Sequence, residues 1–402
     1  MAEWSKTQLS DILVDKGYIR GPFGSALRRG DMKENGVPVY EQQHAIYDSR
    51  CFRYYIDEQK FVEMKRFQVN TDDLIISCSG TVGKVSIIRD DDPKGIISQA
   101  LLLLRVDRNK ILPLYLKYFF SSRDGYNAIV SRSSGSVQVN IAKRDVIEQI
   151  PLMLPKIETQ RKIVGVLNSI DKKIEENERI NNNLEQQAEA IFQSILSNAI
   201  TTVNLGEIAD VKGGKRLPKG VNLIDIPNAH PYIRVRDLNN ALFASLTPNY
   251  AYVDKETQKS ISRYIVSTGD VLISIVGTIG LTAIVDSTLD KANLTENCVK
   301  VTNLKHITPE YLLLYLRSQL GREAIAKGTV GAVQQKLPIK NIQAIPIPLL
   351  SEKDKNALFC TLDSIFAGIS NNVIQSAKLA SLRDTLLPRL MSGELDVSDI
   401  DL

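Results

Sequence analysis

The chain has 402 residues, 43% of them hydrophobic and 24% charged, which is enough apolar material for more than one core. Its 50 Lys and Arg against 46 Asp and Glu give a net charge of +4, too small an excess to identify a partner by itself. The four cysteines include no closely spaced pair, and we find no secretory leader and no apolar run of 18 residues. These features argue against a disulfide framework and a membrane span, so we expect a soluble, reduced, cytoplasmic protein without contact to a membrane.

Residues 1–157 predict an α/β segment. Runs rich in β-branched residues predict strands, and a proline at the first helical turn predicts a short helix. In chain order these elements are the strands 74–77, 85–88 and 96–106 and the helix 114–120. The glycines at 80 and 83 lie between two strands and indicate a hairpin turn.

Residues 158–198 predict one long helix. Alternate steps of four and three residues from Ile163 follow a heptad seam that contains no proline. The seam consists of Ile163, Leu167, Ile170, Ile174, Asn177, Asn181, Leu184, Ala188, Ile191 and Ile195. A seam of roughly 35 to 40 residues is about three times as long as an average globular helix.

Residues 199–350 repeat the first segment at an offset of 195 to 197 residues. The string Asp-Leu-Ile-Ile-Ser at 73–77 returns as Asp-Val-Leu-Ile-Ser at 270–274, and the turn Gly-Thr-Val-Gly at 80–83 returns as Gly-Thr-Ile-Gly at 277–280. The corresponding predicted elements are the strands 271–275, 281–285 and 298–301 and the helix 311–316. Framework positions match while the segments between them diverge, so the two halves share a scaffold and differ in surface.

Residues 351–402 predict a second long helix and a tail. Its seam consists of Leu358, Leu362, Ile365, Ile369, Asn372, Ser376, Leu379, Arg383, Leu386 and Leu390. Arg383 and Pro388 depart from the pattern, so we expect this helix to end near Leu387.

Both seams are apolar at the ends and polar in the middle, which suits an antiparallel helix pair. In that arrangement Asn177 and Asn181 meet Asn372 and Ser376, and such a polar layer fixes the register at a cost in stability. The alternative is that each stripe packs on its own globular segment, as most amphipathic helices do. The length of the seams favours pairing, since a segment of about 150 residues offers no face that long.

The positive charge is confined to the two globular segments. Residues 1–157 carry 23 Lys and Arg against 19 Asp and Glu, and residues 199–350 carry 17 against 12. The helical stretch 158–197 carries 5 against 7, and 351–395 carries 5 against 5. A polyanion is therefore expected on the globular segments, which leaves the helices for protein contacts.

No motif indicates an active site. The string at 80–84 resembles a phosphate-binding loop, but Val85 follows Lys84 and the repeat has Leu281 in place of the lysine, so we interpret it as a turn. The three histidines are isolated from one another and from paired cysteines, which argues against a metal site. Glu63-Met64-Lys65 fits a nuclease string but does not recur, and neither an amino-group methylation motif nor a glycine-rich cofactor fingerprint is present.

Glycine-rich basic loops near the start of each half suit nucleic acid, with a solvated surface loop as the alternative. Glycine lets the backbone approach a phosphate, and Arg or Lys contacts a phosphate or grips guanine. The candidate DNA-contacting residues in the first half are Arg20, Phe23, Ser25, Arg28, Arg29, Thr81, Lys84, Gln138 and Asn140. Those in the second half are Lys212, Lys215, Arg216, Lys219, Arg234, Arg236, Thr278, Gln334, Gln335 and Lys336.

The sequence resembles the specificity subunits of type I restriction-modification systems over its full length. The resemblance rests on the Gly-Pro-Phe-Gly-Ser loop at 21–25, the Ser-Gly-Thr-Val-Gly-Lys turn at 79–84, the junction from Ile150 to Ile163, and the ending from Leu382 to Leu395. The second half departs from it, since it lacks the Phe-Gly-Ser form of the loop and has Leu350 where the first half has Pro155.

This resemblance implies two target-recognition domains, at 1–157 and 199–350, and two central antiparallel helices, at 158–198 and at 351–402 with the tail. Each domain is expected to read one half of an asymmetric, gapped double-stranded DNA target. The helices are expected to set the spacer and to dock two modification subunits, joined by restriction subunits that act as translocases. No cofactor is expected on this chain, while S-adenosylmethionine, ATP and Mg²⁺ are expected on the partners.

Two alternatives stay open from the sequence alone. In the first alternative the chain is a self-contained nuclease or methyltransferase. In the second it is a specificity subunit of a complex that only methylates. The target bases and the spacer length are not readable from the residues.

Overall fold

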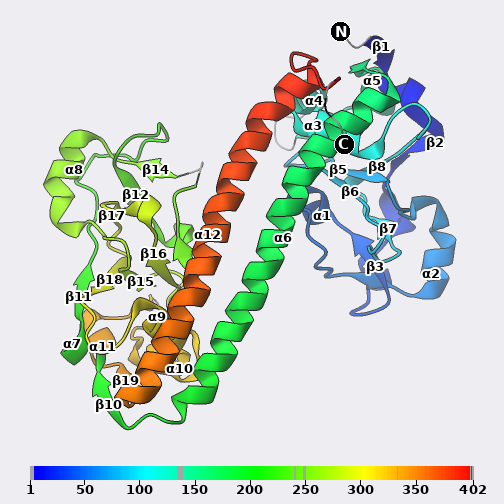
Figure 1. Ribbon diagram of the computed structural model, residues 1–402. Helices are drawn as coiled ribbons and strands as arrows, with labels where there is room; N and C mark the ends of the chain where they lie inside the picture. The colour runs from blue at the N-terminus through cyan, green and yellow to red at the C-terminus, as the bar shows by residue number, and fades with distance from the viewer. Residues whose placement is uncertain are drawn as a thin grey trace. The chain divides into compact units, whose positions relative to one another are not determined.

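The computed structural model describes residues 4–133, 139–239, 241–247, 250–332, 334–398 and 400. The chain forms two compact units, which we call unit 1 and unit 2. Unit 1 comprises Met1–Ile174 and Ala377–Leu402, and unit 2 comprises Glu175–Ser376. Each unit mixes helices and sheets, as expected (Figure 1).

The main sheet of unit 1 has four strands in the order β2-β8-β5-β6, and all neighbours are antiparallel. These strands are β2 Leu13–Arg20, β5 Leu74–Ser77, β6 Val85–Ile87 and β8 Leu101–Val106. All four residues of β5 are buried, as are the four leucines that open β8, because the strands are covered on both faces. Such continuous apolar runs are typical of central strands.

Two smaller sheets and short helices complete unit 1. A three-stranded sheet has the order β4-β3-β7, and a two-stranded sheet pairs β1 with β9. The strands of these two sheets are β1 Ser5–Gln8, β3 Val37–Tyr40, β4 Tyr55–Ile56, β7 Ile96–Ile97 and β9 Pro151–Leu154. The α-helices are α1 Gln42–Tyr47, α2 Glu58–Glu63, α3 Pro113–Ser121, α4 Arg123–Val130 and α5 Arg144–Glu148. Short 3-10 turns are η1 Leu9–Ile12, η2 Gly24–Ala26, η3 Arg29–Asp31 and η4 Lys65–Phe67.

The main sheet of unit 2 has the order β11-β18-β15-β16-β13. Its first four strands are antiparallel neighbours in the same succession as in unit 1, and β13 adds a short parallel strand beside β16. The strands are β11 Asp210–Gly213, β13 Phe243–Ala244, β15 Val271–Ser274, β16 Thr282–Val285 and β18 Cys298–Thr302.

The remaining elements of unit 2 also have counterparts in unit 1. A three-stranded sheet has the order β14-β12-β17 and a two-stranded sheet pairs β10 with β19. The strands are β10 Thr201–Asn204, β12 Pro231–Ile233, β14 Ala251–Tyr252, β17 Asn293–Leu294 and β19 Pro346–Leu349. The helices are α7 Leu205–Ile208, α8 Lys255–Ile261, α9 Pro309–Arg317, α10 Gln319–Gly328 and α11 Ile339–Gln343. The 3-10 turns are η5 Val235–Asp237, η6 Ser262–Tyr264 and η7 Ser287–Leu289.

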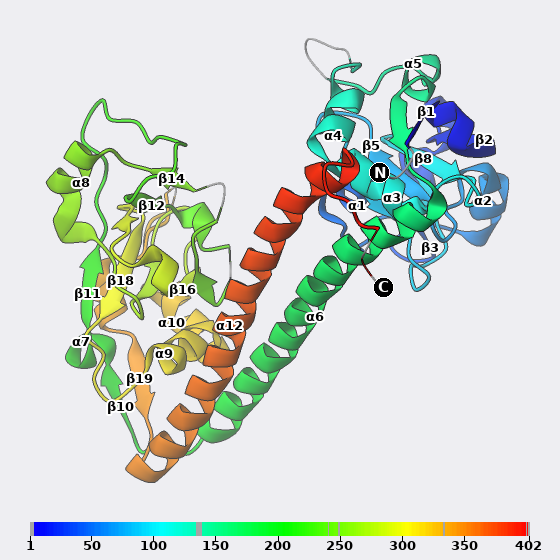
Figure 2. The ribbon, with the colours of Figure 1, turned by 45° about the horizontal axis from the view of Figure 1, so that its top comes forward.

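Two helices of 40 residues, α6 Ile157–Leu196 and α12 Glu352–Met391, each contribute to both units. Within each unit they lie side by side in Figure 1 and Figure 2. In unit 2, Asn177 Nδ2 donates to Gln375 Oε1 (2.8 Å) and Ser376 Oγ (3.1 Å), and Asn372 Nδ2 donates to Asn181 Oδ1 (2.8 Å). Residue numbers rise on one helix as they fall on the other, so this section of the pair is antiparallel and the predicted polar layer is present.

In unit 1 the two helices are joined by an ion pair of the seam residue Arg383. Its Nη1 lies 2.9 Å from Asp171 Oδ1, and Asp171 also accepts a hydrogen bond from the Tyr118 hydroxyl of α3 (2.7 Å). A charged residue is thus tolerated in the seam because it has a carboxylate partner on the facing helix.

The ends of the seams pack on the globular cores, so the alternative interpretation is partly correct as well. Ile163 and Leu167 belong to the core of unit 1, and Leu358, Leu362 and Ile369 to the core of unit 2. The helix-pairing residues predicted from the heptads are all buried or half-buried: Ile163, Leu167, Ile170, Ile174, Asn177, Asn181, Leu184, Ile191, Leu358, Leu362, Ile365, Ile369, Asn372, Ser376 and Leu379. The seams omit Phe192 and Phe366, which the core of unit 2 also buries.

The predicted end of the second helix near Leu387 is wrong. Helix α12 continues through Pro388 to Met391, and the carbonyl of Pro388 still accepts from the Ser392 amide at 3.0 Å. Proline removes one intrahelical hydrogen bond, but the extra turn buries Leu390 and Met391 in the core of unit 1. Burial of such side chains is worth about 1.5–3 kcal/mol each, which offsets the lost bond.

The predicted strand 96–106 is two strands. Strand β7 pairs in parallel with β3, whereas β8 pairs with β2 and β5 of the other sheet. The chain passes from one sheet to the other between them, at residues 98–100. Periodicity does not show such a transition because both strands are apolar.

Helix α12 contains one window of 18 residues whose mean hydropathy of 1.3 would suffice for a membrane span by length and composition. The core helix of a soluble protein passes the same test. Leu358, Leu362, Phe366 and Ile369 of this helix are buried in the core of unit 2.

Candidate nucleic-acid interface

The loops with the predicted DNA-contacting residues of unit 1 meet at one edge of its main sheet. Strands β2 and β5 end at this edge, and β6 and β8 begin there. The amide of Gly21 donates to Leu101 O (3.0 Å), and that of Cys78 donates to Ala100 O (2.9 Å). We call the loops 21–25, 78–84 and 98–100, with residues 139–141, the loop edge of unit 1.

Residues 139–141 reach the loop edge although they are distant in sequence. Gly80 N donates to Val139 O at 2.9 Å, and Ser79 Oγ donates to Asn140 Oδ1 at 2.9 Å. Gln42 of helix α1 donates from Nε2 to Ser79 O at 2.5 Å. The fold therefore brings the predicted Thr81, Lys84 and Asn140 together.

Cations at this edge rest on aromatic rings. The Arg20 guanidinium lies 5.4 Å from the centre of the Phe23 ring, and Lys84 Nζ lies 4.8 Å from the centre of the Tyr126 ring. Among the described residues no carboxylate pairs with Arg20 or Lys84, and Phe23 is 63% exposed. A ring orients a cation. Lys84 is exposed, so its ammonium stays available to an anion, whereas Nη1 of Arg20 is buried.

Unit 2 has the same edge. Strands β11 and β15 end there, and β16 and β18 begin there. The amide of Gly214 donates to Cys298 O (3.0 Å), that of Ile275 to Asn297 O (2.8 Å), and that of Leu337 to Ile275 O (3.0 Å). The loop edge of unit 2 is therefore formed by the loops 214–219, 275–281 and 295–297, with residues 334–337.

In each loop edge the first loop (21–25 or 214–219) lies directly against the third (98–100 or 295–297), and only glycine permits this contact. A Cβ atom at Gly21 would lie 1.9 Å from Ser98 O, and one at Gly214 would lie 2.0 Å from Thr295 O. Both distances are far below any real contact, so the two glycines fix the loops in equivalent positions in both units.

The cations of the unit 2 edge differ in their surroundings. Lys215 Nζ lies 5.5 Å from the centre of the Tyr264 ring, while Arg216 Nε lies 2.7 Å from Glu296 Oε1. Burial opposes ionisation of Glu296, but the hydrogen bond from Arg216 lowers its pKa below the ordinary value. Both charges of this pair are therefore present at neutral pH.

The other predicted cations of unit 2 lie as follows. Arg234 makes a bidentate contact with Asp237 (2.9 and 3.0 Å), and Arg236, whose side chain is 70% exposed, lies 3.9 Å from the same carboxylate. Lys212 pairs with Asp210 at 2.9 Å on strand β11. The residues Lys219, Thr278, Gln334, Gln335 and Lys336 are exposed, and Lys336 pairs through its backbone with Val276 of the turn.

Two predicted cations of unit 1, Arg28 and Arg29, lie outside the loop edge, whereas Ser25 lies within it. Arg28 and Arg29 are exposed at turn η3, where the Arg28 amide donates to Asp31 Oδ2 at 2.7 Å. Ser25 belongs to turn η2 in the loop that carries Phe23. Gln138 lies outside the described residues.

The sequence did not single out Gln42 and Glu296. Gln42 holds helix α1 to the turn 78–84, and Glu296 holds Arg216. No sequence signal reports either contact, because the partners are 37 and 80 residues apart and belong to different loops.

The predicted hairpin turns are present in both units. The turn glycines 80, 83, 277 and 280 all have φ between 66° and 85°, which is the left-handed region that glycine adopts freely. The turn 80–84 lies between two antiparallel strands, whereas a phosphate-binding loop leads into a helix.

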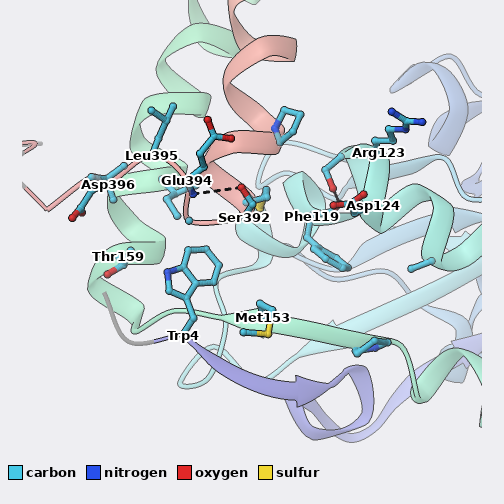
Figure 3. A pocket seen from close by; sticks show the side chains of 18 residues that line it. Trp4, Phe119, Arg123, Asp124, Met153, Thr159, Ser392, Glu394, Leu395 and Asp396 are labelled. Atoms are coloured by element: carbon cyan, nitrogen blue, oxygen red, sulfur yellow. Dashed lines mark hydrogen bonds between the residues drawn. The ribbon is translucent and has the colours of Figure 1, made fainter. Parts of the chain in front are cut away.

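Unit 1 has a cavity (Figure 3), and none of the residues that line it belongs to the loop edge. Its volume is about 1000 Å³, and its wall includes Trp4, Phe119, Met153 and the tail residues 391–397. The wall is mainly apolar, and Glu394 is already paired with Arg389 (2.7 Å). In the described part of the chain, no group of three His, Cys, Asp or Glu is arranged to hold a metal ion.

The fold and site thus define a protein of two mixed α and β units with equivalent frameworks, each presenting one loop edge that carries cations. The chain belongs to the family of the type I restriction modification DNA specificity domain, whose model matches residues 2–186 and again 199–378. Each match includes one loop edge.

Curated relatives of the same kind cover most of the chain. The MjaVIII specificity subunit of Methanocaldococcus jannaschii is 19% identical over 426 residues, covering 99% of this chain and 94% of the relative. The EcoBI specificity subunit of Escherichia coli is 21% identical over 367 residues, covering 82% and 75%. Both are named as subunits of type I restriction enzymes.

A solved structure supports the fold. The S subunit of a type I restriction-modification system from M. genitalium superposes with a TM-score of 0.59 at 16% identity, covering 97% of this chain and 96% of that one. At this identity the likeness concerns the fold.

Proposed function

We propose that the chain is the DNA-reading, non-catalytic specificity subunit of a type I restriction-modification complex, and that each loop edge reads one half of a bipartite target. The observation that carries the proposal is the repetition of the family match, with one equivalent loop edge in each matched region. Divergent loops on a shared framework support two different half-sites. The recognition domains are residues 1–157 and 199–350.

Helices α6 and α12 form a central coiled coil that relates the two halves by a pseudo-two-fold repeat. The antiparallel polar layer at Asn177, Asn181, Asn372 and Ser376 supports this arrangement, because such a layer fixes one register. The pair sets the spacer between the half-sites and docks two modification subunits. Restriction subunits that act as translocases complete the complex in the cytoplasm.

The chain itself holds no cofactor. S-adenosylmethionine, ATP and Mg²⁺ belong to the partner subunits in this proposal. The absence of a metal-binding cluster among the described residues is compatible with this division and does not establish it.

The test compares the purified chain alone with the chain assembled with its modification subunits, each given duplex DNA, Mg²⁺ and S-adenosylmethionine. The chain alone is expected to neither methylate nor cut, while the assembled complex methylates a gapped, asymmetric sequence. Methylation or cleavage by the chain alone would establish a self-contained enzyme instead. Methylation without cleavage after restriction subunits and ATP are added would indicate a methylation-only complex.

A further inference from the structure

We infer that Arg216 and Glu296 together read one G·C base pair in the half-site of unit 2. This inference rests on the proposed function and names the chemistry of one readout position. Guanine presents two acceptors, O6 and N7, in the major groove, and cytosine presents the N4 amine as a donor. A guanidinium and a carboxylate held side by side match that pattern, with Arg216 donating to guanine and Glu296 accepting from cytosine.

The first argument is the position of the pair. Gly21 and Gly214 are the equivalent contact points of the first loop, so Phe23 and Arg216 occupy the same place two residues later. By the same backbone contacts Gln99 corresponds to Glu296, because the next residues, Ala100 and Asn297, both accept from the adjacent turn. The same two positions therefore hold Phe23 and Gln99 in unit 1, and the ion pair of Arg216 and Glu296 in unit 2.

The second argument is exposure. Phe23 is 63% exposed, and the side chain of Arg216 is 81% exposed. In the facing loop, Gln99 is exposed and Glu296 has 30% of its side chain accessible. The position thus faces solvent in both units and differs in chemistry, as expected where two half-sites differ.

The third argument is the geometry of the pair. Only Nε of Arg216 donates to Glu296, and the described residues provide no partner for its two terminal amino groups. Those groups are the donors that grip guanine in a bidentate contact. Thr295 Oγ1 donates to Glu296 Oε2 at 3.1 Å, so the carboxylate is held on both oxygens and orients the arginine.

The loop beneath the pair is firmly held. The Lys215 amide donates to Leu294 O (2.8 Å), and the Tyr232 hydroxyl donates to Lys215 O (2.9 Å). Arg216 therefore starts from a fixed backbone, which lowers the entropy lost when it binds a base.

The fourth argument concerns electrostatics. A carboxylate at a DNA-binding edge repels phosphates and weakens binding to every sequence. An exposed ion pair adds little to folding stability, so stability does not account for Glu296. A carboxylate that accepts from cytosine discriminates against other bases, and this favours the correct site over the excess of nonspecific DNA.

The test measures base preference with the assembled methyltransferase complex. After methylation mapping defines the wild-type target, equilibrium binding is measured on duplexes carrying each base pair in turn at every position of both half-sites. The variants are Arg216→Lys, which keeps the charge and loses the bidentate grip, and Glu296→Gln, which removes the carboxylate. Asp290→Asn is the matched charge control, because Asp290 accepts from the Thr268 amide (3.1 Å) just before β15, at the end of the sheet opposite the loop edge.

Arg216→Lys is expected to reduce preference for G·C by about 5- to 150-fold at one position of one half-site, the range of a lost bidentate contact. Glu296→Gln is expected to reduce preference at the same position, while its affinity for nonspecific DNA rises. Asp290→Asn leaves the whole profile unchanged.

Other results overturn the inference in distinct ways. A uniform loss over all sequences in Arg216→Lys would make Arg216 a phosphate contact and leave the proposed function standing. Relaxation in Arg216→Lys without any change in Glu296→Gln would remove the carboxylate from the readout. A wild-type complex with no sequence preference would instead refute the proposed function itself.

Discussion

The loop edges of unit 1 and unit 2 are built on the same succession of strands but hold their charges differently. In unit 1, Arg20 and Lys84 rest on the rings of Phe23 and Tyr126, and no carboxylate in the described part of the chain forms an ion pair with either. In unit 2, Lys215 rests on Tyr264, while Arg216 is bound to Glu296. The comparison teaches that the framework fixes where a side chain is presented, whereas the loops decide whether its charge is paired with a carboxylate.

The largest expected effect comes from replacing one unit's recognition segment. Exchanging residues 1–157 for the corresponding domain of another family member should abolish recognition of the original first half-site and leave the second intact. The reason is that each loop edge is closed by contacts within its own unit. Methylation mapping of the hybrid complex measures this, and a change in both half-sites would show that the units do not read independently.

Lengthening both long helices should increase the spacing between the two half-sites and leave the sequence of each half-site unchanged. One heptad inserted near Asn177 and one near Asn372 keeps the seam in phase and adds about 10 Å, since a helix rises about 1.5 Å per residue. The spacer is expected to grow by about three base pairs at ~3.4 Å each. Methylation mapping of the lengthened complex measures the length of the spacer.

The matched control for this experiment inserts four residues into α6 alone. That insertion breaks the pairing of Asn177 and Asn181 with α12 and should abolish assembly. An active complex with the double heptad insertion and the original spacer would mean that the helices do not set the separation.

Acid should weaken unit 1 through His44, whose equivalent position in unit 2 carries Asp237. His44 is fully buried and accepts from the Glu41 amide at Nδ1 (2.7 Å). Burial lowers its pKa below the ordinary value of 6.5, so the folded unit binds its proton less readily than the unfolded chain. The contribution of neutral His44 to the free energy of unfolding is complete above about pH 6.5. It is lost as the pH falls through the lower pKa of the folded state.

This dependence is measurable by thermal unfolding of the chain between pH 5 and 7. His44→Asn keeps an acceptor for the Glu41 amide and does not titrate. The variant is expected to be less stable throughout, because the smaller side chain leaves a cavity, but to lose part of the slope with pH. An unchanged slope would assign the acid sensitivity to other groups.

The smallest effects are expected from the lysines that rest on rings. Lys84→Ala in unit 1 and Lys215→Ala in unit 2 should each weaken binding to all sequences alike and reduce the salt slope by about one. Lys117→Ala is the control, because Lys117 also lies over a tyrosine ring, at 5.8 Å, but on helix α3. Loss of preference for a single base in Lys84→Ala would make that lysine a reader.

The framework of this protein was predictable from local sequence. A short apolar run predicts strand β5, and the glycines that follow it at 80 and 83 predict the turn. The repeat in the second half supplied a second observation of each. The polar layer at Asn177 was predictable because polar residues interrupt both heptad seams near their midpoints, which sets the register of an antiparallel pair.

The site was less accessible because its contacts join distant loops. The partnership of Arg216 with Glu296 spans 80 residues and depends on the approach of Gly214 to Thr295 O. Likewise, the extension of α12 through Pro388 depends on burial of Leu390 and Met391 in an apolar core that only the folded unit 1 provides. Neither is encoded within a window of neighbouring residues.

The division of the chain into units has a consequence for biosynthesis. Unit 2 is one uninterrupted stretch, Glu175–Ser376, inserted into unit 1. Leu387, Leu390 and Val397 are buried in the core of unit 1, together with residues such as Leu9 from the other end of the chain. As the ribosome releases the chain, the inserted unit can close first, whereas unit 1, whose first segment emerged earlier, cannot complete its core until Leu387, Leu390 and Val397 have emerged.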